Sequence, residues 1–343
     1  GRDSSPEAQN DMYDTGSEFM HRCTKNTERA LVHRVLAVGD VNADLILTGL
    51  SRLPQSEQEA LAQGFEVAIG GQTGTTARTL SSLGVSVTFV GKVGDDAYGR
   101  LAVAQLEQDG VDPSGVIIDP GLKTGVTVVL STGPERAYTT YLGSIAEVRR
   151  SDIPGELLQG ADHIHVGSYY LQKKLRPELA ELFREARGAG LSTSLDPGWD
   201  PSDEWGSDIF DVLSYVDVFL PNEIEALAIS RADTPGDALQ VLAERAEVVV
   251  IKQGARGCLA RNKKKTSRCP AFEVPVIDVT SAGDIFNAGF IFALLKKWDL
   301  DTAVRFATAC GAIAVTKAGS SGIISGLQEV EDFLASRLRP NIE

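Results

Sequence analysis

The sequence predicts an α/β protein, in which a mainly parallel sheet is covered by helices on both faces and a small second β-sheet stands apart. Three observations lead to this prediction. The 343 residues, 43% of them hydrophobic, suffice for one large domain. Apolar runs of strand length alternate with amphipathic stretches of helical period along most of the chain. Two segments, 45–68 and 122–142, instead have strand patterns with no helix between them.

The individual elements follow from this alternation. The clearest strands are apolar and rich in β-branched residues, and they are predicted at 35–38, 87–90, 163–166, 192–195, 216–220 and 248–251. The helices have an apolar face at helical spacing and are predicted at 76–83, 101–109, 179–187, 223–229, 285–297 and 301–317. Strands that alternate with helices in this way pair in parallel.

The segments 45–68 and 122–142 interrupt that rhythm. The second has alternating apolar residues and a turn at 133–134, so both segments read as antiparallel strands. They are interpreted as a small separate sheet that forms a lid. The pattern alone equally allows a β-hairpin that extends the main sheet.

The N-terminal residues 1–19 are polar and aperiodic, and the residues just before Met20 read like a translated cloning site. We therefore interpret 1–19 as a disordered, vector-derived tag. The predicted domain is a single one, from 33 to 338.

The composition limits the class of partner. The formal charge is −14 and the pI is about 4.8, which argues against nucleic acid or an anionic membrane, because such binding depends on Lys and Arg. The apolar stretch around 288–295 is too short for a membrane span. Four cysteines lie far apart, so reduced thiols in a cytoplasmic protein are expected, with a small molecule as the ligand.

Polar residues after the first strand are the first candidate for binding chemistry. Asn42 and Asp44 lie two apart in an extended segment, so they project to the same side. An amide and a carboxylate together suit a sugar diol, and the alternative is an ordinary turn with Asx caps.

The second candidate is a glycine-rich turn that runs into a helix. Gly70 and Gly71 would let the backbone approach a ligand closely, and the helix start supplies free N–H groups. A dinucleotide site is the competing interpretation, but the spacing differs from G-x-G-x-x-G.

Asn222 and Glu225 stand where a strand ends and a helix begins. Asn222 reads as the N-cap and Glu225 as the third helical residue of a capping box. A carboxylate and an amide at this place could equally hold hydrated Mg²⁺.

Lys252, Gly254 and Gly257 follow another strand. The glycines fit a tight hairpin turn, on which a nucleotide could also lie. The charge run at 261–265 is most simply the solvated tip of the next hairpin.

The most informative segment precedes the strongly apolar helix near 285–297. Ser281, Ala282 and Gly283 are small, so the first backbone N–H groups of the helix stay uncovered and form an anion site. Asp284 in the first turn could be a favourable cap. An acid beside an anion site is also what phosphoryl transfer to an alcohol requires, since the acid removes the hydroxyl proton.

These residues resemble the ribokinase, or PfkB, family of carbohydrate and nucleoside kinases, from about residue 35 to residue 338. The segment 278–284 reads D-V-T-S-A-G-D against the family signature D-T-x-G-A-G-D. The resemblance implies a three-layer ribokinase-like fold with Asp284 as the catalytic base. It implies that the amides of Ser281, Ala282 and Gly283 form the anion hole.

The resemblance also implies roles for the other motifs. Asn42, Asp44, Gly70 and Gly71 match substrate ligands, and Thr75 stands where the family usually has asparagine, which puts ribose in doubt. The nucleotide and its phosphates are assigned to Asn222, Lys252, Gly254 and Gly257, and Mg²⁺ through water to Glu225. A monovalent cation such as K⁺ is assigned to Asp278 and the Thr280 carbonyl, with further ligands near 315–320.

The predicted function is therefore ATP- and Mg²⁺-dependent phosphorylation of the primary hydroxyl of a sugar, by a homodimer joined through its lids. One alternative is a nucleoside kinase, for which Tyr138, Tyr141, Tyr169 and Tyr170 are candidate base platforms. From another class, the chain could be a catalytically silent ligand-binding protein. A sugar phosphate is less expected, since no Lys/Arg cluster coincides with the substrate motifs.

Overall fold

The structure is a computed structural model that describes residues 33–133, 135–317 and 323–337. Its main sheet contains nine described strands: β1 (Arg34–Val38), β4 (Ser86–Gly94), β5 (Asp112–Asp119), β8 (His163–Val166), β9 (Ser192–Leu195), β10 (Val218–Phe219), β11 (Val248–Lys252), β12 (Cys258–Asn262) and β13 (Thr266–Cys269). The helices on its faces are α2 (Gln72–Ser82), α3 (Ala97–Gln108), α4 (Gly155–Gln159), α5 (Leu179–Gly188), α6 (Ile209–Leu213), α7 (Glu223–Ser230), α8 (Pro235–Ala243), α9 (Ala282–Leu295), α10 (Leu300–Ala314) and α11 (Leu327–Ser336).

The strand order is β13-β12-β11-β10-β9-β8-β1-β4-β5. From β5 to β11 neighbouring strands pair in parallel, and the β11–β12–β13 edge is antiparallel. The chain first builds outward from β1 to β4 and β5, and then continues on the other side of β1 with β8. The strand order therefore reverses between β1 and β8, which is where open α/β sheets form a crevice for a ligand.

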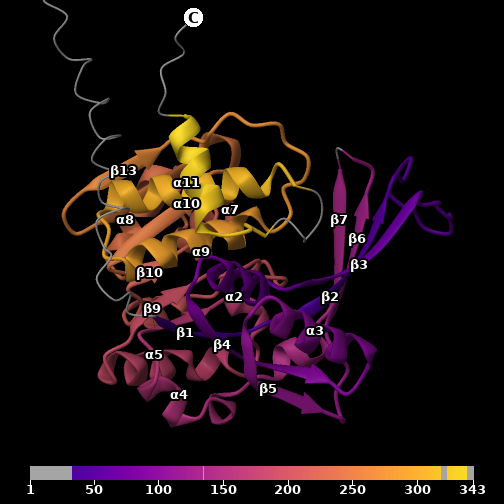
Figure 1. Ribbon diagram of the computed structural model, residues 1–343, viewed down its shortest axis with the longest axis horizontal. Coiled ribbons are helices and arrows are strands. Elements are labelled where there is room, and N and C mark those ends of the chain that lie inside the picture. Colours follow the sequence, from indigo (N-terminus) through magenta and orange to yellow (C-terminus); the bar gives the residue numbers. More distant parts are fainter. Residues whose placement is uncertain (1–32, 134, 318–322, 338–343) are drawn as a thin grey trace, which may run out of the picture.

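Helices cover both faces of this sheet (Figure 1). Alternate residues of β1 point to opposite sides, so Leu36 and Val38 pack in one core and Val35 and Ala37 in the other. The first core includes residues of α4, α5, α6, α7 and α8, and the second includes residues of α2, α3, α9, α10 and α11. The predicted three-layer α/β architecture is confirmed.

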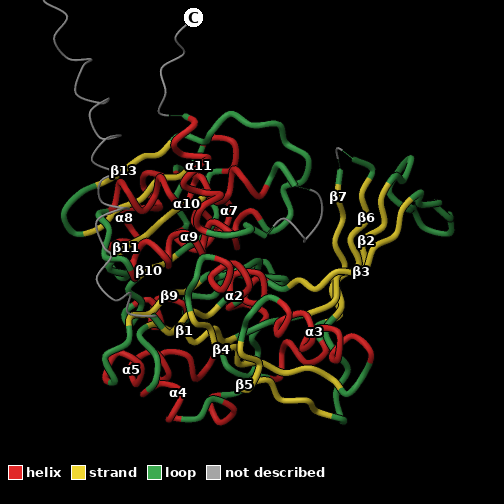
Figure 2. The backbone as a smooth tube through the Cα atoms, in the orientation of Figure 1, coloured by secondary structure: helices red, strands yellow, loops and turns green. Residues whose placement is uncertain are grey.

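A separate four-stranded sheet projects from this body (Figures 1 and 2). Its order is β3 (Gly64–Gly70), β2 (Asn42–Thr48), β6 (Val126–Ser131) and β7 (Arg136–Tyr141). The strands form two antiparallel hairpins, β2–β3 and β6–β7, which join through parallel pairing of β2 with β6. The prediction of a separate sheet is confirmed, and the alternative of a hairpin that extends the main sheet is wrong. We refer to β2, β3, β6 and β7 as the lid.

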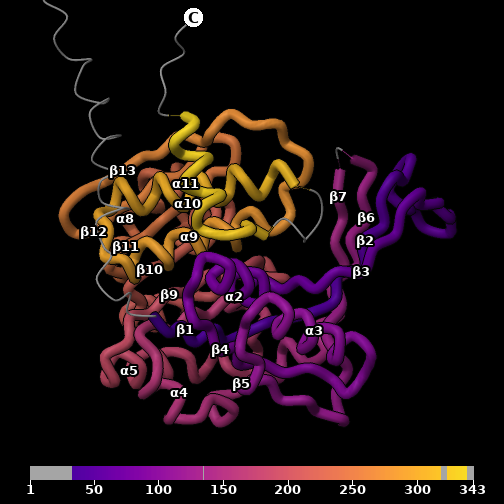
Figure 3. The backbone as a smooth tube through the Cα atoms, viewed as in Figure 1, coloured from indigo at the N-terminus to yellow at the C-terminus, as the bar shows by residue number. Residues whose placement is uncertain are grey.

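Two regions of sequence that are far apart thus lie side by side in the lid, as the colours of Figure 3 make visible. The predicted boundaries 45–68 are close to those observed, but β2 begins earlier, at Asn42, and β3 ends at Gly70. Candidate substrate residues therefore lie where the lid leaves the main body.

The predicted bounds agree best with the observed ones for strands whose apolar residues are buried in the main sheet. Strands β8 and β9 have the predicted bounds, whereas the strand predicted at 216–220 is paired only over Val218–Phe219. The charge run lies at the β12–β13 turn, as expected. Helices α8 and α11 and strand β5 were not predicted: both helices are short, and β5 begins with Asp-Pro-Ser-Gly, residues that are typical of a turn.

Three described cysteines, Cys258, Cys269 and Cys310, are buried free thiols. None of the described helices is both long and apolar enough to cross a membrane. Cys23, Met20 and the proposed tag at 1–19 lie outside the described residues.

A series of hydrogen-bonded polar side chains runs through the buried centre of the main sheet. His163 on β8 contacts the hydroxyls of Ser192 and Ser194 on β9 at 2.7 Å each, and His165 contacts Ser194 at 2.8 Å. Burial lowers the pKa of His163 to about 3 and that of His165 to about 4. Both side chains are therefore neutral inside the folded protein over the physiological range.

We expect this pair to make the protein less stable as the pH falls from 7.5 to 5.5. The unfolded histidines bind protons near pH 6.5 and the folded ones do not, so the pair costs about 3 kcal/mol at pH 5.5. Urea unfolding at both pH values measures the loss. The change in stability between the two pH values should be about 1.4 kcal/mol less unfavourable in His163→Gln than in the parent, since groups with raised pKa values contribute equally to both proteins. Equal losses in the two proteins would contradict this account.

Candidate active site

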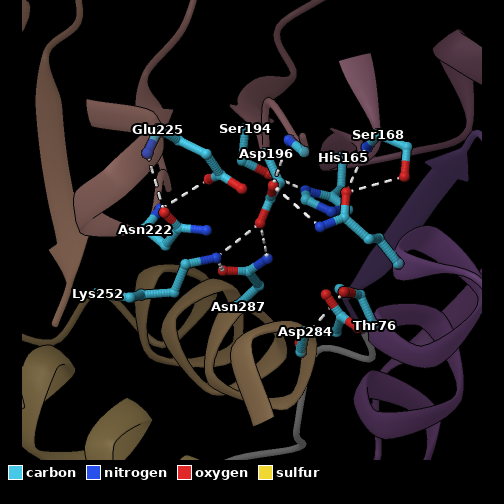
Figure 4. A network of polar contacts seen from close by, with 12 residues as sticks. Thr76, His165, Ser168, Ser194, Asp196, Asn222, Glu225, Lys252, Asp284 and Asn287 are labelled. Carbon is cyan, nitrogen blue, oxygen red and sulfur yellow. Dashed lines mark hydrogen bonds and ion pairs between the residues drawn. The ribbon is translucent and has the colours of Figure 1, made fainter. Parts of the chain in front are cut away.

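The carboxyl ends of four parallel strands meet at one edge of the main sheet. Asp40 follows β1, Ser168 follows β8, Asp196 follows β9 and Lys252 ends β11. Helices α2 and α9 both begin beside this edge, and Thr76 of α2 donates its hydroxyl to the Asp284 carbonyl at 3.2 Å. Figure 4 shows Ser168, Asp196 and Lys252 around one polar centre, with Thr76 and Asp284 beside it. Parallel pairing thus brings together residues that are more than 200 positions apart.

The substrate candidates Asn42 and Asp44 do point to the same side of β2. Asn42 Nδ2 donates to Asp44 Oδ1 at 2.7 Å and to Thr127 Oγ1 of β6 at 3.2 Å. Both side chains are buried. Burial raises the pKa of Asp44 to about 6, although the hydrogen bond from Asn42 opposes it. The amide and carboxylate therefore form a buried pair at the base of the lid, as the spacing predicted.

Gly70, which ends β3, and Gly71, which follows it, are both required by geometry. A Cβ on Gly70 would lie 2.1 Å from Asp44 Oδ2, so a side chain there would displace the carboxylate. Gly71 has φ +92°, and its Cβ would lie 2.7 Å from the Asp40 carbonyl oxygen. The glycine-rich turn thus packs directly against Asp40 and Asp44.

Asp40 was not recognised from the sequence. Its carboxylate accepts the N–H groups of Gln72 at 2.9 Å and Thr73 at 3.1 Å, and it therefore caps α2 from β1. Thr75, one turn into α2, has a buried hydroxyl with no hydrogen-bond partner among the described residues.

Asp196, Lys252 and Asn287 form the buried centre of the site (Figure 4). Lys252 Nζ donates to Asp196 Oδ2 at 2.7 Å and to Asn287 Oδ1 at 3.0 Å, and Asn287 Nδ2 donates to Asp196 Oδ2 at 2.6 Å. Burial opposes ionisation of Asp196, but Lys252 and these hydrogen bonds lower its pKa. Lys252 was a predicted site residue. Asp196 was missed, although its place directly after a buried strand was a usable signal.

Asp284 stands in the first turn of α9, where the sequence placed it. Burial and the neighbouring Asp196 carboxylate raise the pKa of Asp284 well above its usual range, while Lys252 opposes them. The carboxyl group is therefore a proton acceptor of raised basicity beside a lysine ammonium group.

The predicted anion hole precedes this carboxylate. The N–H groups of Ser281 and Gly283 find no acceptor among the described residues, and that of Ala282 makes only a long bond of 3.4 Å to the Val279 carbonyl. Ser281 has φ +61°, a left-handed conformation that favours glycine. A Cβ on Gly283 would lie 3.6 Å from Lys252 Nζ. Donors and a cation therefore face the same space at the start of α9.

Asn222 and Glu225 form the predicted capping box of α7. Asn222 Oδ1 accepts the Glu225 N–H at 3.0 Å, and Glu225 Oε2 accepts the Asn222 N–H at 2.8 Å. Burial and the nearby Asp196 charge raise the pKa of Glu225 to about 7. A backbone bridge between Asn222 and Lys252 places this carboxylate next to the central cluster.

Gly254 and Gly257 lie in the turn between β11 and β12. Both have positive φ, and a Cβ on Gly257 would lie 2.0 Å from the Cys269 carbonyl oxygen. The hairpin interpretation of this segment is confirmed, and its glycines lie next to Lys252 in the chain.

The side chains of Asp278 and Thr280 both contact Arg136 of the lid in this arrangement. Asp278 Oδ1 accepts Arg136 Nη1 of the lid at 2.5 Å, and Thr280 Oγ1 also contacts Arg136. The Val315 carbonyl, in the region assigned to further ligands, accepts the N–H groups of Ile277 and Asp278. The Asp278 carboxylate and the Val315 carbonyl thus already accept donors of the protein, and the monovalent cation at Asp278 and the Thr280 carbonyl stays a prediction. Residues 318–320 lie outside the described residues.

Comparison with known proteins identifies the family. A family model described as pfkB family carbohydrate kinase matches residues 32–325. The chain belongs to this family. An ATP-dependent ribose-1-phosphate kinase from Halopiger xanaduensis is 31% identical over 308 residues, which cover 89% of this chain and 99% of that protein. Probable fructokinase-5 from Arabidopsis thaliana is 28% identical over 305 residues, which cover 83% and 94% of the two chains.

The solved structures agree with this family. A ribokinase from Thermotoga maritima superposes with a TM-score of 0.76 at 27% identity, covering 89% of this chain and 99% of that one. The chain is therefore a kinase of the ribokinase type that acts on a sugar, with ATP as co-substrate. The resemblance drawn from the signature around Asp284 is confirmed at the level of the family.

The buried ion pair between Asp196 and Lys252 leads to a prediction about stability. We expect Asp196→Asn to lower the free energy of unfolding by about 3–5 kcal/mol, because Lys252 would stay buried without the counter-charge to which it is hydrogen-bonded. The double variant Asp196→Asn, Lys252→Met should lose clearly less, since no unpaired charge remains. Urea unfolding at pH 7.5 measures both. A double variant that loses as much stability as Asp196→Asn, or more, would contradict the pairing.

Proposed function

We propose that this kinase transfers the γ-phosphoryl group of ATP to the primary hydroxyl of an uncharged sugar, which binds between the lid and the carboxyl edge of the main sheet. The observation that supports it most strongly is the arrangement at the start of α9. The Asp284 carboxyl group, the free N–H groups of Ser281 and Gly283 and the Lys252 ammonium group all border one space.

The sugar is assigned to the base of the lid. Asn42 and Asp44 offer one amide and one carboxylate for its hydroxyls, and Gly70 and Gly71 let the backbone approach it. The unpartnered Thr75 hydroxyl is a further candidate contact. None of these five residues carries a positive charge, which favours an uncharged sugar over a sugar phosphate.

A nucleoside is less well supported. Tyr169 and Tyr170 are buried in the core beside Trp205 and Arg176, so they do not offer a face to a base. Tyr138 and Tyr141 of the lid are more than half exposed. The tyrosine platform on which the nucleoside alternative depended is therefore not assembled from these four residues.

In the proposed reaction, Asp284 accepts the proton of the sugar hydroxyl. The hydroxyl oxygen bonds to the γ-phosphorus atom of ATP, and the bond between that phosphorus atom and ADP breaks. The N–H groups of Ser281, Ala282 and Gly283 donate to the oxygens of the transferred group. These donors are fixed by the helix backbone, so they need not reorganise as charge accumulates. Lys252 adds a positive charge on the same side.

We assign the nucleotide to the side of Asn222, Lys252, Gly254 and Gly257, next to the anion hole. Glu225 fits a hydrated Mg²⁺, because a buried carboxylate with a pKa near 7 gains from a neighbouring cation. The described residues contain no cluster of three or more His, Cys, Asp or Glu that would hold a metal alone. When bound, Mg²⁺ would neutralise charge on the triphosphate.

The lid suggests how the reaction is shielded and how chains associate. It would close over the sugar to exclude water. Leu61, Phe65, Tyr138 and Tyr141 are exposed on the lid and its connecting loop, which supports a homodimer in which lids pair. The buried free thiols are consistent with a cytoplasmic location, which we also propose.

We expect Asp284→Asn to lower kcat by about 10²–10⁴-fold with little change in ATP affinity, because only the proton acceptor is lost. ADP release is measured first over a panel of ribose, fructose, ribose 1-phosphate, adenosine and inosine, and then for the variant with the best substrate. Asp301→Asn, at the first turn of α10, is the matched control.

Activity of Asp284→Asn within threefold of the parent would overturn the assignment of the base. A parent protein that releases ADP with no member of the panel, together with unchanged ligand affinities in Asp284→Asn, would favour a silent ligand-binding protein instead.

The pKa of Asp44 predicts the pH dependence of substrate binding. Because this pKa is raised to about 6, the carboxylate is ionised above pH 6 and becomes a neutral acid below it. The KM for the sugar should therefore rise about tenfold for each pH unit below 6. In Asp44→Asn the KM should be higher at pH 7.5 and no longer rise on acidification. A KM that rises equally in both proteins would contradict the role of Asp44.

A further inference from the structure

Arg136 is the one described residue of the lid strands that forms an ion pair with the loop before α9. It begins β7, an edge strand of the lid, yet its guanidinium group bonds Asp278 at 2.5 Å and also contacts Thr280 Oγ1. The Arg136 and Asp278 side chains are only 18% and 16% exposed, so the pair is largely shielded from water. Such a pair is stronger than one at an open surface.

The pair lies directly beside the proposed anion hole. Thr280 N–H donates to Asp278 Oδ1 at 2.7 Å, so the carboxylate holds the backbone of this turn as well as Arg136. Ser281 follows at once in its left-handed conformation, and Gly283 is two residues further on. Burial would raise the pKa of Asp278, but the hydrogen bonds from Arg136 and Thr280 lower it, so the carboxylate stays ionised.

We propose that Arg136 is a positioning residue, whose guanidinium group takes the place of a monovalent cation at the Asp278–Thr280 turn and ties the conformation of the anion hole to the position of the lid. The inference rests on the proposed function and adds to it. The Asp278 carboxylate, which the resemblance assigns to a cation, already binds a positive charge supplied by the chain itself.

Two consequences follow from the placement of that charge on β7. Catalysis needs no K⁺, since the Asp278 charge is balanced by Arg136. When the lid moves away from the body, the guanidinium group leaves with it, and the turn that presents the Ser281 and Gly283 N–H groups loses its support. A closed lid and an ordered anion hole therefore occur together.

The first test compares activity in KCl and in choline chloride at equal ionic strength. The parent enzyme should differ less than twofold between the two salts. Arg136→Ala should lower kcat by roughly 10²-fold, the order expected when reacting groups are misplaced by about 1 Å. Arg136→Lys keeps the charge, so its kcat should lie between those of the parent and Arg136→Ala. Guanidinium chloride at millimolar concentration should partly restore the kcat of Arg136→Ala.

The matched control is Arg52→Ala. Arg52 lies in the loop between β2 and β3 and contacts Gln58 of the same loop. The Arg52→Ala substitution removes a positive charge from the lid region without contacting the Asp278–Thr280 turn. The kcat of this variant should stay within twofold of the parent. A parent enzyme stimulated tenfold or more by K⁺, or an Arg136→Ala enzyme with unchanged kcat, would overturn the proposal.

A second readout does not depend on catalysis. Hydrogen exchange of the ligand-free protein, followed by mass spectrometry, should be at least tenfold faster over 126–131 and 136–141 in Arg136→Ala, and unchanged in Arg52→Ala. Equal exchange in Arg136→Ala and the parent would overturn the link between lid and body. Because exchange needs no substrate, this result stands even if the parent phosphorylates no sugar in the panel and the proposed function fails.

Discussion

The buried contact between Lys252 and Asp196 is the interaction on which the rest of the site depends. It joins the ends of β9 and β11, and through Asn287 it also holds α9 against the edge of the sheet. One ammonium group here faces three carboxyl groups, those of Asp196, Glu225 and Asp284. Asp196 takes the ionised state, and the pKa values of the other two rise as a result of burial and its charge. A single pairing thus decides which acid is a fixed charge and which ones can take a proton.

Carboxyl groups outnumber ammonium groups at this edge of the sheet. The edge would therefore suit a nucleoside triphosphate only together with cations. Glu225 and Asp284 are poorly solvated and lie close to the start of α9, where free N–H groups attract an anion. The negative side chains would repel that anion unless they were protonated or neutralised. Lys252 meets part of this need, and a hydrated metal ion beside Glu225 would meet another part. At the Asp278–Thr280 turn the corresponding charge comes from Arg136.

The lid has two roles that follow from its attachment. Its central strand β2 begins with Asn42 and Asp44, so the substrate candidates lie at the base of the lid rather than at its tip. Its edge strand β7 carries Arg136 to the loop before α9. The proposed sugar side and the proposed phosphate side of the site are therefore both connected to the same small sheet. Movement of that sheet would change both together.

Local patterns in the sequence were sufficient for a large part of this description. Strand and helix periods predicted the three layers, because apolar side chains must be buried on both faces of a parallel sheet. Small residues before an apolar helix predicted the free N–H groups at Ser281 and Gly283, since those donors are exposed by the helix start itself. The capping box of Asn222 and Glu225 was likewise local, and the family signature around Asp284 was enough to recognise the kinase family.

Only the tertiary structure decided the contacts between distant residues. Asp196, Lys252 and Asn287 come from three separate elements, and nothing in their local sequence states that their side chains meet. Arg136 lies 142 residues from Asp278, so the ion pair between them could not be inferred from either segment. Side-chain contacts across a fold depend on how strands are ordered and how far a lid reaches, and a local pattern carries no information about either. The sequence by itself determined most of the elements and their chemistry, while their packing determined which charges face one another.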